Sequence, residues 1–363
     1  MSISVARSWE MCKKEVSGTP CIISYTLCVK SHKADIVIRV WIHRLAETVS
    51  FVLFIVLLIG YTVRPDSLAA LTFFPVWAWA LLSMCLALFT LRHNKRALFI
   101  CLAGWLLFVL VLAEEPKSLL HGLAISRPTP QTISQHNLVT VVSLNCAGGS
   151  IDAVREILPV HPDIVLLQEV PSNADMRPYA QELFGDNGEI AYGPDTAIVV
   201  KGKLEQTPLP RSRNSFMTAA RIRLHSGFEA NVICIRLRPP VIDTNILSPA
   251  CWKNHREDRK ARRKQIGEIV TQIDQIPGAL PLILGGDFNV GANDGCLRAL
   301  RSRVRDTFAK CGVGWGHTAI NTIPLFRVDQ IWAGSALKPV CVYAKKTKHS
   351  DHRMVICHLA IPQ

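Results

Sequence analysis

The stretch Leu280–Val290, LPLILGGDFNV, decides the fold of the second half of this 363-residue chain. Its apolar run is typical of a buried strand, and two glycines then deliver Asp287 and Asn289 at the end of that strand. Polar groups are costly to bury unless they are paired or used, so a buried strand should not end in a carboxylate and an amide without cause. These two residues are therefore candidate functional residues.

Four further segments also place polar residues at the mouth of an expected strand. They are VVSLNCAGG (141–149), PDIVLLQEV (162–170), FRVDQIWAG (326–334) and KHSDHRMVICHLAI (348–361). The residues that they contribute are Asn145, Gln168, Glu169, Asp329, Asp351 and His352. Taken singly, each fits an ordinary turn or surface residue. Five such places in one domain are hard to explain in that way.

Strand and helix patterns alternate from Leu138 onward. Short β-branched runs predict strands at Leu138–Leu144, Asp163–Val170, Thr196–Val200, Ala230–Leu237, Leu280–Leu284, Val328–Trp332, Val340–Tyr343 and Met354–Leu359. Helical patterns occupy Ile151–Leu158, Ala174–Phe184, Trp252–Ile276 and Asp294–Leu300. This mixture indicates an α/β or α+β domain with buried sheets, without fixing the topology.

The set SLN, QE, GDFN, RVD and SDH, in this order, resembles the endonuclease/exonuclease/phosphatase superfamily. That group includes deoxyribonuclease I-like nucleases, apurinic endonucleases of the exonuclease III type, inositol polyphosphate phosphatases and neutral sphingomyelinases. The resemblance covers Leu138 to Ile361, and GDFN and SDH are its most specific parts. It implies an α+β fold, a four-layer α/β sandwich of two mixed β-sheets flanked by helices.

The resemblance also implies a divalent-metal site. Glu169 would bind Mg²⁺ or Mn²⁺, with Asn145 beside it as an oxygen ligand or an orienting amide, and Asp351 would complete the shell of metal and water. Mg²⁺ takes few protein oxygens and keeps several waters, so one strong carboxylate is enough.

The remaining motif residues would carry the reaction, an in-line attack of water on phosphorus. Asp287 would position or deprotonate the water, and Asn289 would donate a hydrogen bond to a phosphate oxygen. Asp329 would hold the tautomer of His352 and favour its protonated, phosphate-contacting form.

One residue departs from the family pattern. The segment ANVICIRLRPP (230–240) has Arg236 where many members of the superfamily have a histidine. An arginine does not release its proton near neutral pH, but its planar fork can clamp a phosphate. We therefore expect Arg236 to serve both catalysis and substrate binding.

Hydrophobic stretches precede this domain, and their concentration there explains a mean hydropathy of +0.23 in a chain with 19% charged residues. Three uncharged apolar runs, at 48–63, 67–91 and 97–113, predict three transmembrane helices. A buried helical hairpin is the alternative. The expected organisation is an N-terminal tail (1–44) that we leave unassigned, a three-span region (45–113), a linker (114–137) and a catalytic domain (138–363).

The distribution of Lys and Arg predicts the orientation of these spans. Basic residues lie before the first span and in the loop Arg92–Arg96, RHNKR, whereas Glu114 and Glu115 follow the third span. The tally places the N-terminus in the cytoplasm and the catalytic domain outside it, so we expect an integral membrane protein with an extracytoplasmic catalytic domain.

The net charge of +13 favours anionic partners, either nucleic acid or a phospholipid headgroup, besides the membrane lipid itself. The basic run Lys253–Lys264, KNHREDRKARRK, is read first as the solvated face of a helix and second as a phosphate-steering ridge. Seven cysteines follow Gln135 without any CxxC pair, and most are expected to be small buried hydrophobes. We expect structural or surface roles for His317, His349 and His358, and we predict no protein partner.

The leading hypothesis is a membrane-anchored, Mg²⁺- or Mn²⁺-dependent phosphodiesterase or endonuclease. A second hypothesis keeps this chemistry and makes the substrate a phospholipid of the sphingomyelin type. A third, of another class, is a non-catalytic binding or scaffold protein with a decayed site, and Arg236 is its only support.

Overall fold

The computed structural model describes residues 21–90, 95–170, 176–278 and 280–361. These residues form two compact units, which we describe separately. The larger unit comprises Val56–Leu82 and Ala103–Gln363, and the smaller unit comprises the described residues up to Ile55 together with Ser83–Leu102. Of the expected N-terminal tail, residues 1–20 lie outside the description, as do residues 91–94 of the loop RHNKR.

Long apolar helices supply the candidate spans. They are α2 (Cys21–Val63), α4 (Val76–Thr90) and α5 (Lys95–Leu112). Arg44–Val63 and Lys95–Leu112 are long and apolar enough to cross a membrane. A third span exists only if the pair Asp66–Thr72 and Val76–Leu88, bent by 70°, counts as one. Two of the three expected spans are thus single helices of sufficient length and apolar composition. The expected middle span, 67–91, is interrupted by the bend between α3 and α4.

Two mixed sheets form the larger unit, and the first has the strand order β10-β11-β1-β2-β4-β3. Its members are β1 (Leu138–Asn145), β2 (Ile164–Gln168), β3 (Gly188–Tyr192), β4 (Thr196–Gln206), β10 (Lys338–Lys345) and β11 (Met354–Ala360). Only β1 and β2 run parallel within this sheet. Their carboxyl ends, Asn145 and Gln168, therefore lie side by side.

The second sheet has the order β4-β5-β6-β7-β9-β8. It adds β5 (Met217–Leu224), β6 (Glu229–Arg236), β7 (Leu282–Asp287), β8 (Arg305–Asp306) and β9 (Asp329–Ala333). Strand β4 belongs to both sheets, because Thr196–Val200 pairs with β2 and Gly202–Gln206 pairs with β5. The expected strand at Leu280–Leu284 begins two residues later and continues through the two glycines to Asp287.

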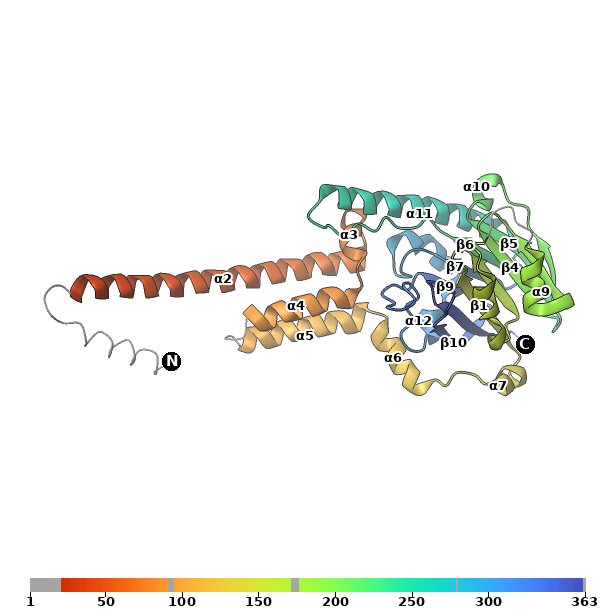
Figure 1. Ribbon diagram of the computed structural model, residues 1–363, viewed down its shortest axis with the longest axis horizontal. Helices are drawn as coiled ribbons and strands as arrows, with labels where there is room; N and C mark the ends of the chain where they lie inside the picture. The colour runs from red at the N-terminus through yellow and green to blue at the C-terminus, as the bar shows by residue number, and fades with distance from the viewer. Residues whose placement is uncertain (1–20, 91–94, 171–175, 279, 362–363) are drawn as a thin grey trace. The chain divides into compact units, whose positions relative to one another are not determined.

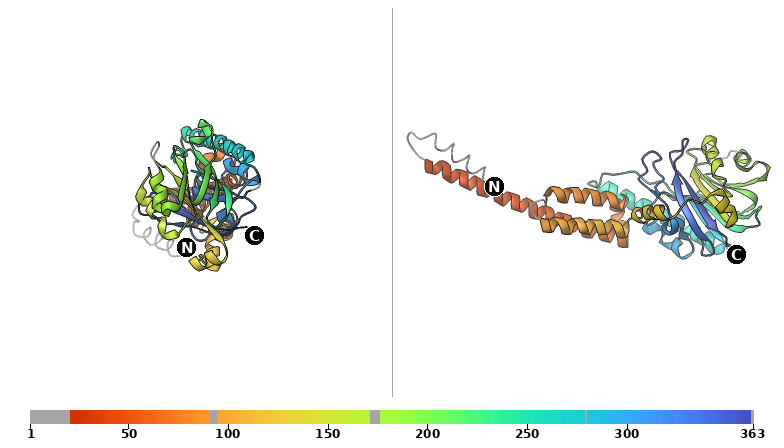
Figure 2. Two further views of the ribbon diagram at one scale, coloured as in Figure 1. Left: turned by 90° about the vertical axis from the view of Figure 1, so that its right-hand side faces the viewer. Right: turned by 90° about the horizontal axis from the view of Figure 1, so that it is seen from below.

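Helices cover the outer face of each sheet, which gives four layers. A core of alternating strand residues lies between the two sheets. The short helices α8 (Ile151–Arg155) and α9 (Arg177–Phe184) pack on the first sheet, and α11 (Pro249–Gln275) with η4 (Gly295–Ser302) packs on the second. Figure 1 and the left view of Figure 2 show α9 and α11 on opposite sides of the strands. The predicted four-layer α/β sandwich is confirmed.

Further short helices connect these elements. They are η1 (Asp66–Leu68), α3 (Ala69–Thr72), α6 (Glu115–Ala124), α7 (Pro130–Gln135), η2 (Leu158–Val160), η3 (Gly185–Asn187), α10 (Arg211–Asn214) and α12 (Thr307–Cys311). Helices α6 and α7 fall in the segment expected to be a linker. The first residues of that segment also pack on the domain, because Glu114 contacts buried Arg327 at 2.7 Å and Glu115 contacts His317 at 2.7 Å.

The basic run on α11 is divided between two environments. Arg259 is buried and donates to the carbonyl of Pro65, to Thr72 and to Asp294, at 2.7–3.0 Å. Arg263 forms an ion pair with Asp66 at 2.5 Å. Part of the expected solvated face therefore holds the segment between the first two apolar helices against the catalytic domain. The seven cysteines after Gln135 are free and buried, as expected.

The end of β7, just before Asp287, depends on a glycine. Gly286 has a φ of 138°, and a Cβ there would lie 1.9 Å from the carbonyl oxygen of Ile235 on β6. We expect Gly286→Ala to lower the free energy of unfolding by about 3 kcal/mol or more, through backbone strain and overpacking. Chemical denaturation of the detergent-solubilised chain measures the change.

Gly267 is the control, because it lies within α11 and an added Cβ would meet nothing within 4 Å. Gly267→Ala should raise the free energy of unfolding by up to about 1 kcal/mol, as expected for a helix interior. Equal stabilities for the two variants would contradict this account of Gly286.

Candidate active site

Three strands of the second sheet bring three candidate residues into register. Arg236 ends β6 and pairs with Asp287, which ends β7, and Asp287 pairs in turn with Asp329, which begins β9. Side chains of register partners point to the same face of a sheet. The three residues therefore form a row at one end of the sheet.

The first sheet contributes Asn145 and Glu169 from the ends of its two parallel strands. The amide of Asn145 donates to Glu169 Oε1 at 2.9 Å and to Asp287 Oδ2 at 3.4 Å. Its carbonyl Oδ1 accepts the backbone N–H of Ala147 at 3.0 Å. Of the two roles expected for Asn145, the geometry is that of an orienting amide that joins the two sheets.

Two residues of the site have left-handed backbone conformations. Glu169 and Asn289 have positive φ values of 54° and 51°, which an asparagine adopts readily but a glutamate only at a cost. Such residues gather at functional sites, where the surrounding structure holds them.

Arg236 bridges two carboxylates. Its NH2 donates to Glu169 Oε1 at 2.7 Å and its NH1 to Asp195 Oδ2 at 2.8 Å, while Nε is buried without a hydrogen-bond partner among the described residues. Burial raises the pKa of Asp195, and the hydrogen bond from Arg236 opposes that rise. Arg236 thus lies in the site with its charge shared between two acids.

Sequence reasoning missed Asp195, and strand pairing explains why. The sequence analysis searched for polar residues at the carboxyl ends of expected strands. Asp195 instead precedes β4, so that search did not include it. Because β4 runs antiparallel to β2 and Thr196 pairs with Gln168, its start lies beside Glu169. The same search applied to the amino ends of antiparallel strands would have found it.

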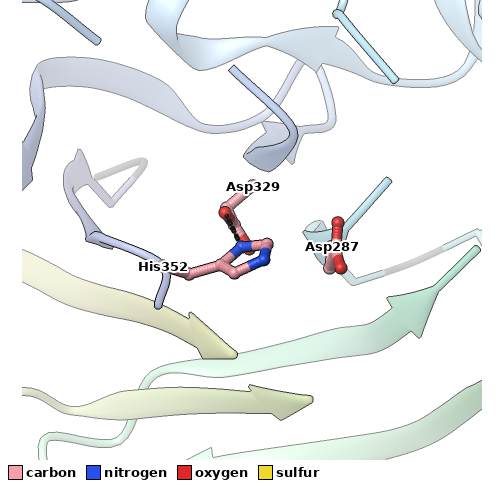
Figure 3. A group of neighbouring side chains, drawn as sticks. All are labelled: Asp287, Asp329 and His352. Atoms are coloured by element: carbon pink, nitrogen blue, oxygen red, sulfur yellow. Dashed lines mark hydrogen bonds and ion pairs between the residues drawn. The ribbon is translucent and has the colours of Figure 1, made fainter. Parts of the chain in front are cut away.

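His352 and Asp329 form the pair that the motif order predicted. The ring Nδ1 of His352 lies 2.7 Å from Asp329 Oδ2, and its other nitrogen faces Asp287 (Figure 3). One ligand atom from each of the three residues lies within 4.8 Å of the other two. Burial lowers the pKa of His352, but the charge and hydrogen bond of Asp329 outweigh it and raise that pKa to about 10. The imidazole is therefore charged at neutral pH.

Asp287 is buried beside this pair. Burial, and then the negative charge of Asp329, raise the pKa of Asp287 to about 7, while the charge of His352 opposes the rise. Asn289 donates its backbone N–H to Asp287 Oδ1 at 2.9 Å. Its side-chain amide donates to Asp287 Oδ2 at 3.0 Å and to the carbonyl of Leu237 at 2.8 Å. The amide that was expected to donate to a phosphate oxygen thus gives one hydrogen to Asp287 and the other to the carbonyl of Leu237.

Two motif residues lie apart from this cluster. Gln168 points into the core, where it donates to the carbonyl of Leu166 and to Cys234. Asp351 is exposed, and its carboxylate has no hydrogen bond or ion pair among the described residues, although its negative charge helps to raise the pKa of His352. Its neighbour Ser350 ties the loop between β10 and β11 to the end of β1, since its hydroxyl donates to the carbonyl of Asn145 at 2.7 Å and accepts from the N–H of His352.

The remaining histidines have partners elsewhere, as expected for structural or surface residues. His317 contacts Glu115, His349 contacts Glu156 at 3.0 Å, and His358 contacts Thr140 at 3.1 Å. Asn145, Glu169, Arg236, Asp287, Asn289, Asp329 and His352 form one connected cluster across the two sheets.

Removing the charge of Asp329 should reverse the shift on His352. In Asp329→Asn, burial becomes the dominant influence, so we expect the pKa of His352 to fall from about 10 to its ordinary value of 6.5 or below. A proton NMR titration of the ring measures it. His358, whose pKa burial alone lowers to about 4, is the control and should not change. A His352 pKa that stays near 10 would show that Asp329 is not its cause.

A family profile and several solved structures are similar to the second half of this chain. A profile of the Endonuclease/Exonuclease/phosphatase family matches residues 142–352. One similar solved structure is an endonuclease/exonuclease/phosphatase family protein from Bacteroides thetaiotaomicron, with 15% identity and a TM-score of 0.48 over 61% of this chain and 94% of that one. The mannosyl-6-phosphatase of the same organism has 16% identity and a TM-score of 0.46 over 61% and 99%.

A third similar structure is D. rerio TDP2 complexed with a single-strand DNA product, with 19% identity and a TM-score of 0.44 over 61% and 98% of the two chains. No curated protein matches the chain. Because the profile covers more than half of the sequence and contains every residue of the cluster, the chain belongs to the endonuclease/exonuclease/phosphatase family of phosphoester hydrolases.

Proposed function

We propose that this protein is a membrane-anchored, divalent-cation-dependent phosphodiesterase that acts by in-line attack of water. The observation that carries the proposal is the trio Asp287, Asp329 and His352. It sets a carboxylate with a pKa of about 7 beside an imidazole with a pKa of about 10. At neutral pH Asp287 can accept a proton while His352 stays protonated, so the site offers both a general base and a charged hydrogen-bond donor.

Each of these residues takes one part of the reaction. Asp287 accepts a proton from water, the water oxygen forms a bond to phosphorus, and the P–O bond to the leaving group breaks. The leaving oxygen takes a proton from solvent. His352 donates a hydrogen bond to a phosphoryl oxygen while Asp329 holds its ring, and charge that builds on phosphorus is stabilised by this preorganised donor.

The two asparagines are positioning residues in this scheme. Asn145 fixes Glu169 and Asp287 relative to each other across the two sheets, and Asn289 fixes both oxygens of Asp287. A general base works only within hydrogen-bond reach of its proton, so the rate depends on these contacts.

The charges of the site support a divalent cation. Four carboxylates, those of Glu169, Asp195, Asp287 and Asp329, surround two cations, Arg236 and His352, so a phosphodiester would meet a negative surface. Among the described residues, nothing contacts Glu169 Oε2, which leaves a hard oxygen ligand available. Glu169 would hold the ion. Asn145 and Asp351, the other two motif residues assigned to the metal, would complete its shell together with water. A cation bound there would supply charge neutralisation on the phosphoryl oxygens.

Arg236 fits the role of a phosphate clamp. A guanidinium has five N–H hydrogens, and the carboxylates of Glu169 and Asp195 take one from NH2 and one from NH1. A second hydrogen on each terminal nitrogen remains for a phosphate. Asp195 lowers the net positive charge that a substrate would experience there.

The direct test is turnover by the full chain in detergent with Mg²⁺ or Mn²⁺, offered plasmid DNA, RNA, sphingomyelin and inositol phosphates in parallel. Chelation should abolish the activity and added metal should restore it. Asp287→Ala and His352→Ala should each lower kcat by about a hundredfold or more, because each removes an acid–base partner.

His349→Ala is the matched control, since His349 is exposed, lies three residues from His352 and pairs with Glu156. It should retain the rate. Absence of turnover on all of these substrates would favour the non-catalytic scaffold instead.

Arg236 generates a graded prediction. Arg236→Ala should lower kcat/KM, because the loss of charged hydrogen bonds raises the corresponding activation free energy by about 1.5–3 kcal/mol. Arg236→Lys should recover only part, because the fork is gone, whereas Arg236→His should hold or raise activity by restoring the residue usual in the family. Steady-state kinetics measure the series.

Asp195→Asn is the companion variant, because it frees the guanidinium from one carboxylate. It should lower KM if Arg236 binds phosphate. If the protein is active and Arg236→Ala leaves kcat/KM unchanged, Arg236 does not clamp the phosphate.

A further inference from the structure

Two exposed apolar loops flank the active site, and we call them the mouth loops. The first follows β6 and spans residues 237–248, where the side chains of Ile242 and Leu247 are 80% and 90% exposed. The second spans residues 312–328 before β9, where Ile320 and Ile323 are 57% and 68% exposed. Exposed aliphatic side chains grouped around a site mark a surface that contacts something apolar.

Both mouth loops are attached to catalytic groups. The first begins directly after Arg236, and the carbonyl of Leu237 accepts from Asn289. In the second, the N–H of Asn321 donates to the carbonyl of Asp351 at 2.7 Å, and Ala319 forms a β-bridge with His352. The exposed apolar residues are therefore carried by the segments that adjoin Arg236 and His352.

The second mouth loop and α11 pack against the break between α3 and α4, which belongs to a candidate span. The ring of Phe73 lies 4.8 Å from His255 and 5.1 Å from Phe326. Trp77, in the first turn of α4, lies 6.0 Å from Trp315 of the second mouth loop. All of these residues belong to the larger unit.

The first mouth loop is fixed to this place through α11. His255 Nε2 lies 2.7 Å from the carbonyl of Asp243, the residue after Ile242, and the N–H of Val241 donates to Asp258 at 2.7 Å. Figure 1 shows the amino end of α11, where this loop enters, beside α3. Lys253, Arg256 and Lys260 are exposed on this part of the helix.

Polar ties fix the active-site end of the sandwich to the ends of the apolar helices. Asn293, which follows GDFN, donates to Glu114 at 2.6 Å, and Arg259 joins Asp294 to Pro65 and Thr72. Arg327, two residues before Asp329, binds Glu114 just beyond α5. Within the larger unit, the end of the domain that carries the chemistry is thus joined to the segments that follow α2 and α5.

We propose that the mouth loops lie in the interfacial layer of the bilayer, and that the substrate is the phosphoester headgroup of a membrane lipid that enters between them. This inference rests on the proposed function for the reaction itself. Aliphatic side chains enter the boundary between headgroups and acyl chains, tryptophans gather at that depth, and basic residues attract anionic headgroups. A nucleic acid would use the basic residues but would leave four exposed aliphatic side chains in water.

The location of the loops is tested first, on the full chain reconstituted in phosphatidylcholine and phosphatidylglycerol vesicles. A fluorophore is attached to Leu247→Cys or Ile323→Cys, and brominated lipid serves as the quencher, with the signal of the unsubstituted chain as background. His225→Cys is the matched control, since His225 is exposed in the hairpin between β5 and β6, at the opposite end of these strands from Arg236. Strong quenching at 247 and 323 but not at 225 is expected, and equal quenching at all three would overturn the docking.

The substrate class is tested with the pair Leu247→Asp and Ile323→Asp against His225→Asp. Release of phosphorylated headgroups from vesicles of phosphatidylcholine, phosphatidylethanolamine and phosphatidylglycerol should fall at least tenfold in the mouth-loop variant only. Turnover of a chromogenic, water-soluble phosphodiester should fall far less.

Hydrolysis of the soluble phosphodiester or of DNA without release from any vesicle lipid would reject the lipid substrate and keep the phosphodiesterase. Absence of all turnover would instead reject the proposed function, while the quenching result would still decide where the loops lie.

Discussion

The face-to-face packing of the two sheets is the constraint on which the site depends. Three contacts that shape the site cross from one sheet to the other: Asn145 to Asp287, Arg236 to Glu169, and His352 to Asp329. Neither sheet alone holds a usable set of groups. The apolar core between the sheets therefore sets the spacing of the acids and bases, and a shift of one sheet along the other would separate all three pairs at once.

The polar ends of buried strands could be predicted from sequence because polarity at such a point conflicts with burial. That conflict located Asn145, Glu169, Asp287, Asp329 and His352. It could not locate Asp195, which precedes β4 rather than following a strand. Asp195 reaches the site only because β4 pairs antiparallel with β2, and the sequence does not reveal that pairing. It also could not say that both amide hydrogens of Asn289 are used within the protein, since hydrogen-bond partners depend on atomic positions.

The membrane-proximal segment shows a second limit of sequence patterns. The run 67–91 is apolar throughout, so hydropathy treats it as one span, yet its first part forms η1 and α3 and packs on α11. Apolar residues satisfy a lipid environment and a protein core equally well. In the same way, the charge run on α11 indicated solvent or phosphate, whereas Arg259 is buried among oxygen acceptors that are distant in sequence.

The buried cluster of Arg327 with Glu114 and Asp306 bears on how this protein can be divided. Arg327 is 5% exposed, and Glu114 supplies one of its two carboxylates from outside the region that the family profile covers. Glu115 likewise supplies the partner of His317. A truncated protein that began at Leu138 would lack Glu114, so buried Arg327 would keep only the carboxylate of Asp306. Removing one partner of a buried ion pair is strongly destabilising. The catalytic domain is therefore not a detachable module on a flexible tether, and a stable soluble fragment would have to begin upstream of Glu114.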